Sequence, residues 1–64
     1  MNEAALVRKE LVDRLDAMAR LFEDVASEAV TEGEIALAAD LWVSSARMLA
    51  AADELWRAGA ETGR

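Results

Sequence analysis

The sequence predicts an all-α protein, an antiparallel helical hairpin that dimerises into a four-helix bundle. Pairs of large apolar residues recur every seven positions, at 41–42, 48–49 and 55–56, and this repeat is typical of a helix that packs against other helices. The 64 residues contain no Pro and three Gly, so few positions break a helix. The hydrophobic content is 55%, which is more than a lone hairpin can cover.

The length of the chain favours an oligomer. A chain of 64 residues forms at most one domain, and its core alone is marginal. Small chains are usually stabilised by disulfides, structural metal or oligomerisation. The chain contains no Cys and no His, so a disulfide is impossible and the common zinc frameworks are excluded. We therefore expect a homo-oligomer, most simply a dimer, without metal or cofactor.

The charge and the apolar runs bear on partners and location. The formal net charge of -6 repels polyanions, which disfavours nucleic acid and anionic membranes as partners. Residues 35–52 are the most apolar run, but Asp40 and Arg47 lie inside it, so no transmembrane segment is predicted. Charged residues also interrupt the N-terminus, unlike a signal peptide. A cytoplasmic protein is expected, and the abundance of Ala and Arg suggests a bacterial or phage source.

The first helix is predicted over about residues 3–30. Large apolar residues recur in it at alternating steps of four and three, as on one face of a helix. With two residues of the second helix they form the predicted core between the two helices: Leu11, Leu15, Met18, Phe22, Val25, Ile35 and Ala38. Lys9, Asp13, Asp16, Arg20, Glu23 and Asp24 are assigned to the solvent-exposed side.

The chain is predicted to reverse at about residues 30–34, and two arrangements fit. Thr31 followed by Glu34 matches a capping box at the start of the second helix. In the alternative, Gly33 adopts a left-handed conformation that ends the first helix, and the second begins at Glu34. Either connection is short enough to make the helices antiparallel.

The second helix is predicted over about residues 34–58, followed by a polar tail over 59–64. Large residues alternate along it with a column of small ones, which allows another backbone to approach closely. Because this helix is apolar around much of its circumference, we expect more than one neighbouring helix to cover it. The predicted oligomer interface consists of Leu41, Trp42, Ser45, Met48, Leu49, Ala52, Leu55 and Trp56.

No catalytic arrangement is predicted, and the protein is not expected to be an enzyme. The common general base, thiol nucleophile and phenol are missing, since the chain has no His, Cys or Tyr. The adjacent Ser44 and Ser45 have no candidate base at helical spacing and are interpreted as small packing residues. Trp56 has an alternative role, as part of an exposed groove that holds a partner helix or peptide.

Two resemblances extend this interpretation. Residues 22–45 resemble a single tetratricopeptide-type hairpin through the positions Phe22, Val25, Ala26, Gly33, Ala38, Trp42 and Ser45. They depart from that repeat at Ala29, where it has an aromatic residue, and the second helix lacks a terminating Pro. In length and hairpin layout the chain is also similar to plasmid-encoded repressor-of-primer proteins, which are dimeric four-helix bundles that bind RNA. These resemblances imply, respectively, binding of a partner peptide and RNA regulation.

The function predicted from the sequence is that of a small non-enzymatic protein-protein interaction module. It would act as a regulator, adaptor or inhibitor in the form of a homo-oligomeric bundle. An RNA-binding bundle and a tetratricopeptide-like hairpin that binds a peptide are the alternatives.

Overall fold

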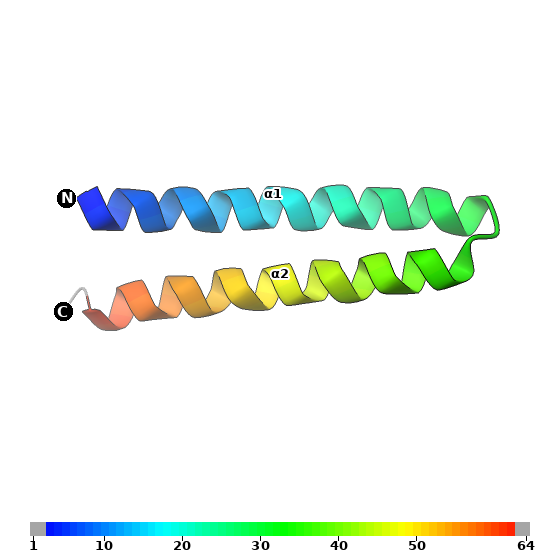
Figure 1. Ribbon diagram of the computed structural model, residues 1–64. Helices are drawn as coiled ribbons and strands as arrows, with labels where there is room; N and C mark the ends of the chain where they lie inside the picture. The colour runs from blue at the N-terminus through cyan, green and yellow to red at the C-terminus, as the bar shows by residue number, and fades with distance from the viewer. Residues whose placement is uncertain (1–2, 63–64) are drawn as a thin grey trace.

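The protein is a hairpin of two long helices. The computed structural model describes residues 3–62, with side chains as far as residue 60. Helix α1 spans Glu3–Thr31 and helix α2 spans Ile35–Thr62, and no strand occurs in this range. The helices lie antiparallel, with the start of α1 and the end of α2 at the end opposite the turn (Figure 1). The predicted helical hairpin is confirmed.

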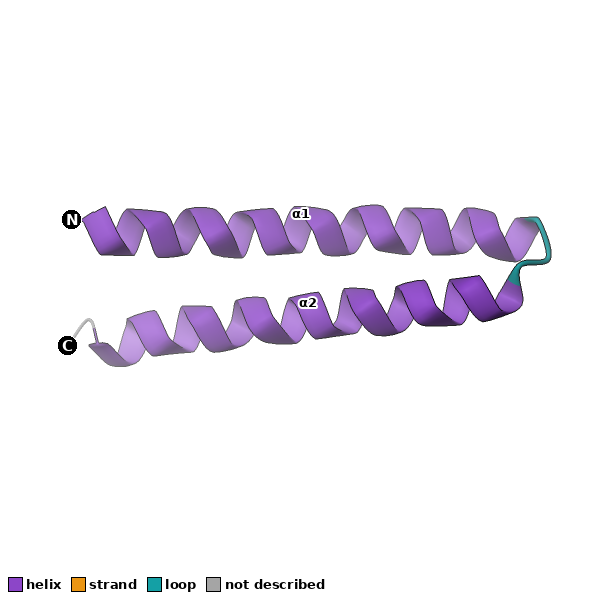
Figure 2. Ribbon diagram, in the orientation of Figure 1, coloured by secondary structure: helices purple, strands orange, loops and turns teal. Residues whose placement is uncertain are grey.

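A short loop joins the helices (Figure 2), and its glycine is left-handed. Gly33 has a φ of 80°; its N–H donates to the carbonyl of Val30 at 3.0 Å, and the N–H of Glu34 donates to Ala29 at 2.8 Å. These two bonds form a Schellman motif, which satisfies the last carbonyls of α1. The hydroxyl of Thr31 donates to the carbonyl of Ser27 within α1, at 3.2 Å, so Thr31 ends α1 and does not cap α2. Of the two predicted arrangements, the structure has the one based on Gly33.

Small residues form the seam between the helices. Within residues 3–60, the side chains that are buried belong to Ala and Ser, with no large side chain fully enclosed. They are Ala19, Ala26, Ala29, Ala38, Ser45 and Ala52. Half-buried Leu15, Phe22, Leu41, Met48 and Leu55 alternate with them along the seam. Because a methyl group or a hydroxyl takes little space, the two backbones approach closely, and the larger side chains fill the gaps beside them.

The predicted core on α1 is corrected by the structure. Leu11, Met18 and Val25 are exposed, whereas Ala19 and Ala26 are fully buried. The seam is therefore rotated about the axis of α1 relative to the predicted stripe. The reason is that the small residues of α1 allow a closer approach to α2. Ile35 was also predicted in the core and is 60% exposed. Leu15, Phe22 and Ala38 do lie at the seam.

Helix α2 continues beyond its predicted end. Gly59 was expected to stop it, but residues 59–62 are helical, and positions 63–64 of the predicted tail lie outside the described residues. A Cβ at Gly59 would lie 2.6 Å from Cδ of Arg8. Gly59 therefore provides the space in which the half-buried Arg8 side chain crosses the open end of the hairpin.

The molecule is an elongated layer with a large surface. Its Cα atoms extend over 48 × 15 × 9 Å, with a radius of gyration of 14.8 Å. A compact domain of this length has a radius of about 11 Å. The accessible surface is 4972 Å², against about 4,000 Å² for a typical globular monomer of the same mass. The hairpin thus exposes about 1,000 Å² more than its size requires.

Candidate interaction surfaces

The seam divides the hairpin into two broad faces. The register is set by Arg8 of α1 beside Gly59 of α2, and by Ala29 packed near Ala38 at the turn. On one flank of the seam, a pocket at the open end brings Lys9 beside Trp56. On the other flank, a second pocket brings Leu11 beside Leu55. The residues seven positions from Trp56 and from Leu11 along each helix continue the two faces toward the turn.

The eight residues that define the first face are uncharged, and it is called here the uncharged face, although Glu3 and Arg8 line the pocket at its open end. Helix α1 contributes mostly large residues to it, and α2 contributes mostly small ones. Its members are Ala4, Leu11, Met18 and Val25 from α1 and Leu37, Ser44, Ala51 and Ala58 from α2. Seven of these eight side chains are exposed and Ser44 is half-buried. This face therefore combines a ridge of large side chains with a shallow strip of small ones.

The second face pairs an apolar ridge with charged residues and is called here the tryptophan face. Helix α2 contributes Ile35, Trp42, Leu49 and Trp56, and α1 contributes Lys9, Asp16, Glu23 and Val30. Trp42 is 46% exposed and Trp56 is 59% exposed. Both tryptophans of the chain lie on this face.

The polar contacts at the tryptophan face involve two acidic residues and one lysine. The Glu23 carboxylate accepts a hydrogen bond from the Ser45 hydroxyl at 3.2 Å across the seam, which holds the carboxylate over the groove between the helices. The Lys9 ammonium is paired with Asp13 on the same helix, with Nζ to Oδ2 at 2.9 Å. Asp16 is half-buried beside the seam. The acidic groups of this face are therefore Asp16 and Glu23, two helical turns apart.

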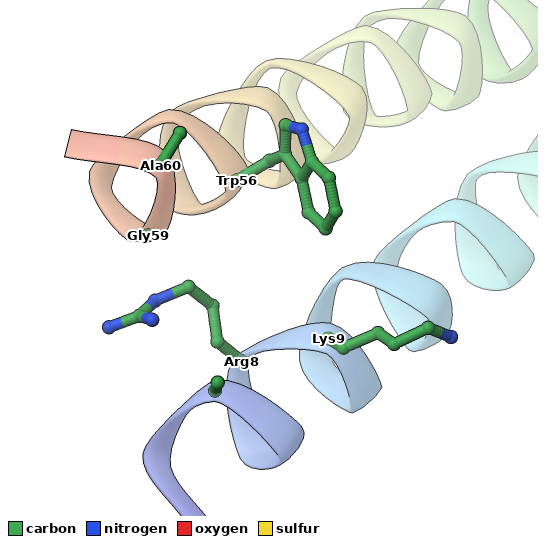
Figure 3. A pocket seen from close by; sticks show the side chains of 6 residues that line it. Arg8, Lys9, Trp56, Gly59 and Ala60 are labelled. Atoms are coloured by element: carbon green, nitrogen blue, oxygen red, sulfur yellow. The ribbon is translucent and has the colours of Figure 1, made fainter. Parts of the chain in front are cut away.

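The pocket on this flank has a volume of about 280 Å³ and is mostly apolar. Figure 3 shows the Trp56 ring on the side of Lys9, with Arg8 extending toward Gly59. Arg8 and Lys9 are the polar side chains among its six lining residues. This volume lies at the lower limit of small-molecule sites, and the pocket is better suited to one apolar side chain of a macromolecular partner.

The predicted oligomer interface is divided by the structure. Trp42, Leu49 and Trp56 are exposed and lie together on the tryptophan face. Ser45 and Ala52 are buried within one chain, and Leu41, Met48 and Leu55 are half-buried along the same seam. For these five residues the assignment to a surface between chains is corrected, because α1 already covers the face of α2 on which they lie.

Sequence reasoning missed the two acidic residues and the uncharged face. Asp16 and Glu23 were placed on the solvent-exposed side, and Leu11, Met18 and Val25 were placed in the core. A signal was present in α1, where Ala19 and Ala26 stand seven apart directly after Met18 and Val25. A seam centred on these alanines would have placed Asp16 and Glu23 beside it.

The basic cluster at Arg8, Lys9 and Arg14 does not form an open basic patch. Arg14 pairs with Glu10 at 2.8 Å and Lys9 pairs with Asp13 at 2.9 Å. Arg8 lies half-buried against Gly59. This neutralisation gives no support to a nucleic-acid surface on α1.

Two further properties concern metals and membranes. Residues 3–62 contain no group of three or more acidic side chains arranged to hold a metal ion. Helix α2 is long and apolar enough over Ile35–Ala60 to cross a membrane, with a mean hydropathy of 1.3 over its most apolar window. Length and composition alone are weak grounds for a spanning helix, since core helices of soluble proteins share them.

The fold and these surfaces define a helical hairpin with apolar faces available for contact. Comparisons with protein-family models, curated proteins and solved structures found no match to this chain.

Proposed function

We propose that the protein is a non-enzymatic protein-protein interaction module that works as a homodimeric four-helix bundle. The observation that supports the proposal is the exposed apolar surface. Within residues 3–60, thirteen large hydrophobic side chains are at least 42% exposed, and apolar surface of this kind marks interaction sites in soluble proteins where it is contiguous. The excess of about 1,000 Å² over a compact monomer is close to the 800 Å² or so that each partner contributes to a standard interface.

The uncharged face fits a second copy better than the tryptophan face. A two-fold dimer through the tryptophan face would bring Asp16 and Glu23 either against the apolar ridge of the other copy or against its acidic residues. The first arrangement removes the carboxylates from water without gaining a cation. The second brings the two copies of Asp16 together, although Lys9 of each copy then lies near Glu23 of the other. Two uncharged faces meet without this cost, and the charged sides of both copies stay in solvent.

Side-chain size also suits self-association through the uncharged face. If a second hairpin is turned about the long axis and laid on this face, α1 of each copy lies over α2 of the other. The large residues of α1 in one copy then lie close to the small residues of α2 in the other. The pairs are Val25 with Ser44, Met18 with Ala51 and Leu11 with Ala58, each offset along the helix axis by about two residues, or about 3 Å. Without any slide, the large side chains of each copy therefore lie beside small ones of the other along the whole face, as bundle packing requires.

The area of the face is sufficient for a stable dimer. A layer of 48 by 15 Å covers about 700 Å² on each copy, close to the standard contribution of each partner. The seam of alanines gives the isolated hairpin little core of its own, so dimerisation would supply the buried apolar area that small domains otherwise lack.

Sedimentation equilibrium tests the dimer, with two matched variants. Met18 on the uncharged face and Trp42 on the tryptophan face are both 46% exposed. We expect a dimer at micromolar concentration for the wild type, a monomer for Met18→Glu, and a dimer for Trp42→Glu. A folded, monodisperse wild-type monomer would overturn the proposal. Dissociation by Trp42→Glu alone would instead assign the dimer to the tryptophan face.

A further inference from the structure

We propose that the tryptophan face binds a basic amphipathic helix of a partner protein. The inference goes beyond self-association, because a dimer through the uncharged face leaves one tryptophan face open on each outer side of the bundle. It depends on the proposed interaction role, but not on the same residues.

The apolar residues of the face have the spacing of a helix that packs against another helix. Ile35, Trp42, Leu49 and Trp56 recur every seven residues on α2. An antiparallel or parallel helix laid beside them presents its own apolar residues at the same repeat. Trp42 and Trp56 each offer an exposed ring of large area, which is typical of residues that dominate binding energy.

The acidic residues of the face favour a partner helix with positive charge. Asp16 and Glu23 lie seven residues apart on α1, or about 10 Å along its axis. Basic residues seven apart on a partner helix would lie opposite both carboxylates when its apolar residues lie on the ridge. An acidic helix would meet repulsion at both positions, so the face discriminates by charge as well as by shape.

The local contacts preserve this acidic character. The Lys9 ammonium is paired with Asp13 at 2.9 Å. Within residues 3–60 neither Asp16 nor Glu23 forms an ion pair, and exposed Arg20 is the basic residue that lies between them in the sequence. The Ser45 hydroxyl donates to Glu23 without adding charge. The net charge of -6 further attracts a basic partner over longer distances.

The open end of the face provides a place for one anchoring side chain. The pocket of about 280 Å³ beside Trp56 continues the apolar ridge beyond its last large residue. Its mouth lies on the same flank as Lys9 (Figure 3). A large apolar residue near one end of the partner helix would fill it.

The two tryptophans provide a direct assay of this face. The probe is a synthetic peptide of about 20 residues, about 30 Å long as a helix, with Leu at the apolar heptad positions, Lys along one flank and no Trp. We expect it to shift the protein's tryptophan emission to shorter wavelength in a saturable manner, because binding removes the rings from water. A peptide with Glu in place of every Lys is the control and is expected to bind at least about tenfold more weakly.

Adjacent acidic residues give a matched pair of variants. Glu23 lies on the tryptophan face and Asp24 points to solvent, and both are exposed. We expect Glu23→Lys to weaken binding of the Lys peptide about five- to tenfold, and Asp24→Lys to weaken it less than about twofold although its net charge is the same. If Glu23→Lys perturbs folding, Glu23→Gln tests the same position, because it retains a hydrogen-bond acceptor for Ser45. We expect Glu23→Gln to weaken binding of the Lys peptide by a smaller factor than Glu23→Lys.

Three outcomes would overturn the proposal. One is the absence of any emission shift at millimolar peptide. Another is equal weakening by Glu23→Lys and Asp24→Lys, which would indicate attraction by net charge alone. The third is the same emission shift with phosphatidylcholine vesicles and no peptide, which would assign the ridge to a membrane surface. The dimer is measured separately by sedimentation, so failure of one proposal does not imply failure of the other.

Discussion

Replacement of Gly33 by alanine should destabilise the hairpin by about 1 kcal/mol. The φ of Gly33 is 80°, where an L-residue other than Gly costs about 1–2 kcal/mol. A Cβ added there meets nothing within 4 Å, so no steric contact adds to this cost. The alanine also restricts the unfolded chain, which offsets about 0.4–1 kcal/mol. For a domain of this size, the net loss corresponds to a decrease in Tm of about 4–8 °C.

Thermal unfolding followed by far-UV circular dichroism measures this effect, and Gly59→Ala is the matched control. Gly59 is helical, and a Cβ there would lie 2.6 Å from Cδ of Arg8, so the Arg8 side chain must move. The gain in helix propensity of about 1 kcal/mol offsets this displacement, so Gly59→Ala should change stability by less than about 1 kcal/mol. Both variants must be compared at one protein concentration, since the proposed dimerisation would make Tm depend on concentration. Equal Tm values for Gly33→Ala and the wild type would refute the assignment of the turn.

Three further predictions concern the seam and the ridge. Ala26 is fully buried, so Ala26→Leu should destabilise the hairpin by about 1–3 kcal/mol in chemical denaturation. The control, Ala17→Leu on the exposed side, should change stability by less than about 0.5 kcal/mol. Similar losses in both variants would contradict the placement of Ala26 at the seam. Ser45→Ala removes the 3.2 Å hydrogen bond to Glu23, and since that exposed carboxylate regains water, the loss should stay below about 1 kcal/mol. The Trp56 side chain is 59% exposed, so Trp56→Ala should retain the helical circular dichroism of the wild type, and a loss of helix would show that the residue belongs to a core.

The outcome for α1 shows why a stripe of apolar residues does not locate a seam. Met18 and Ala19 are adjacent, and so are Val25 and Ala26, so two faces of the helix are apolar along most of its length. A prediction that weighs residues by their apolar size places the larger ones in the core. The alanines are nevertheless buried, because α2 also presents a column of small residues and the closest approach of two helices is reached where both are small.

The sequence by itself determined the helical hairpin, its antiparallel arrangement and the place of the turn. These features follow from local chemistry: the absence of Pro, a single Gly between two apolar periodic segments, and the repeat of large residues in α2. Only the tertiary structure decided the rotation of each helix about its axis. That rotation places Leu11, Met18 and Val25 on an outer face and sets Asp16 and Glu23 beside the tryptophan ridge. It depends on the fit between two helices at once, which the periodicity of either helix alone does not specify.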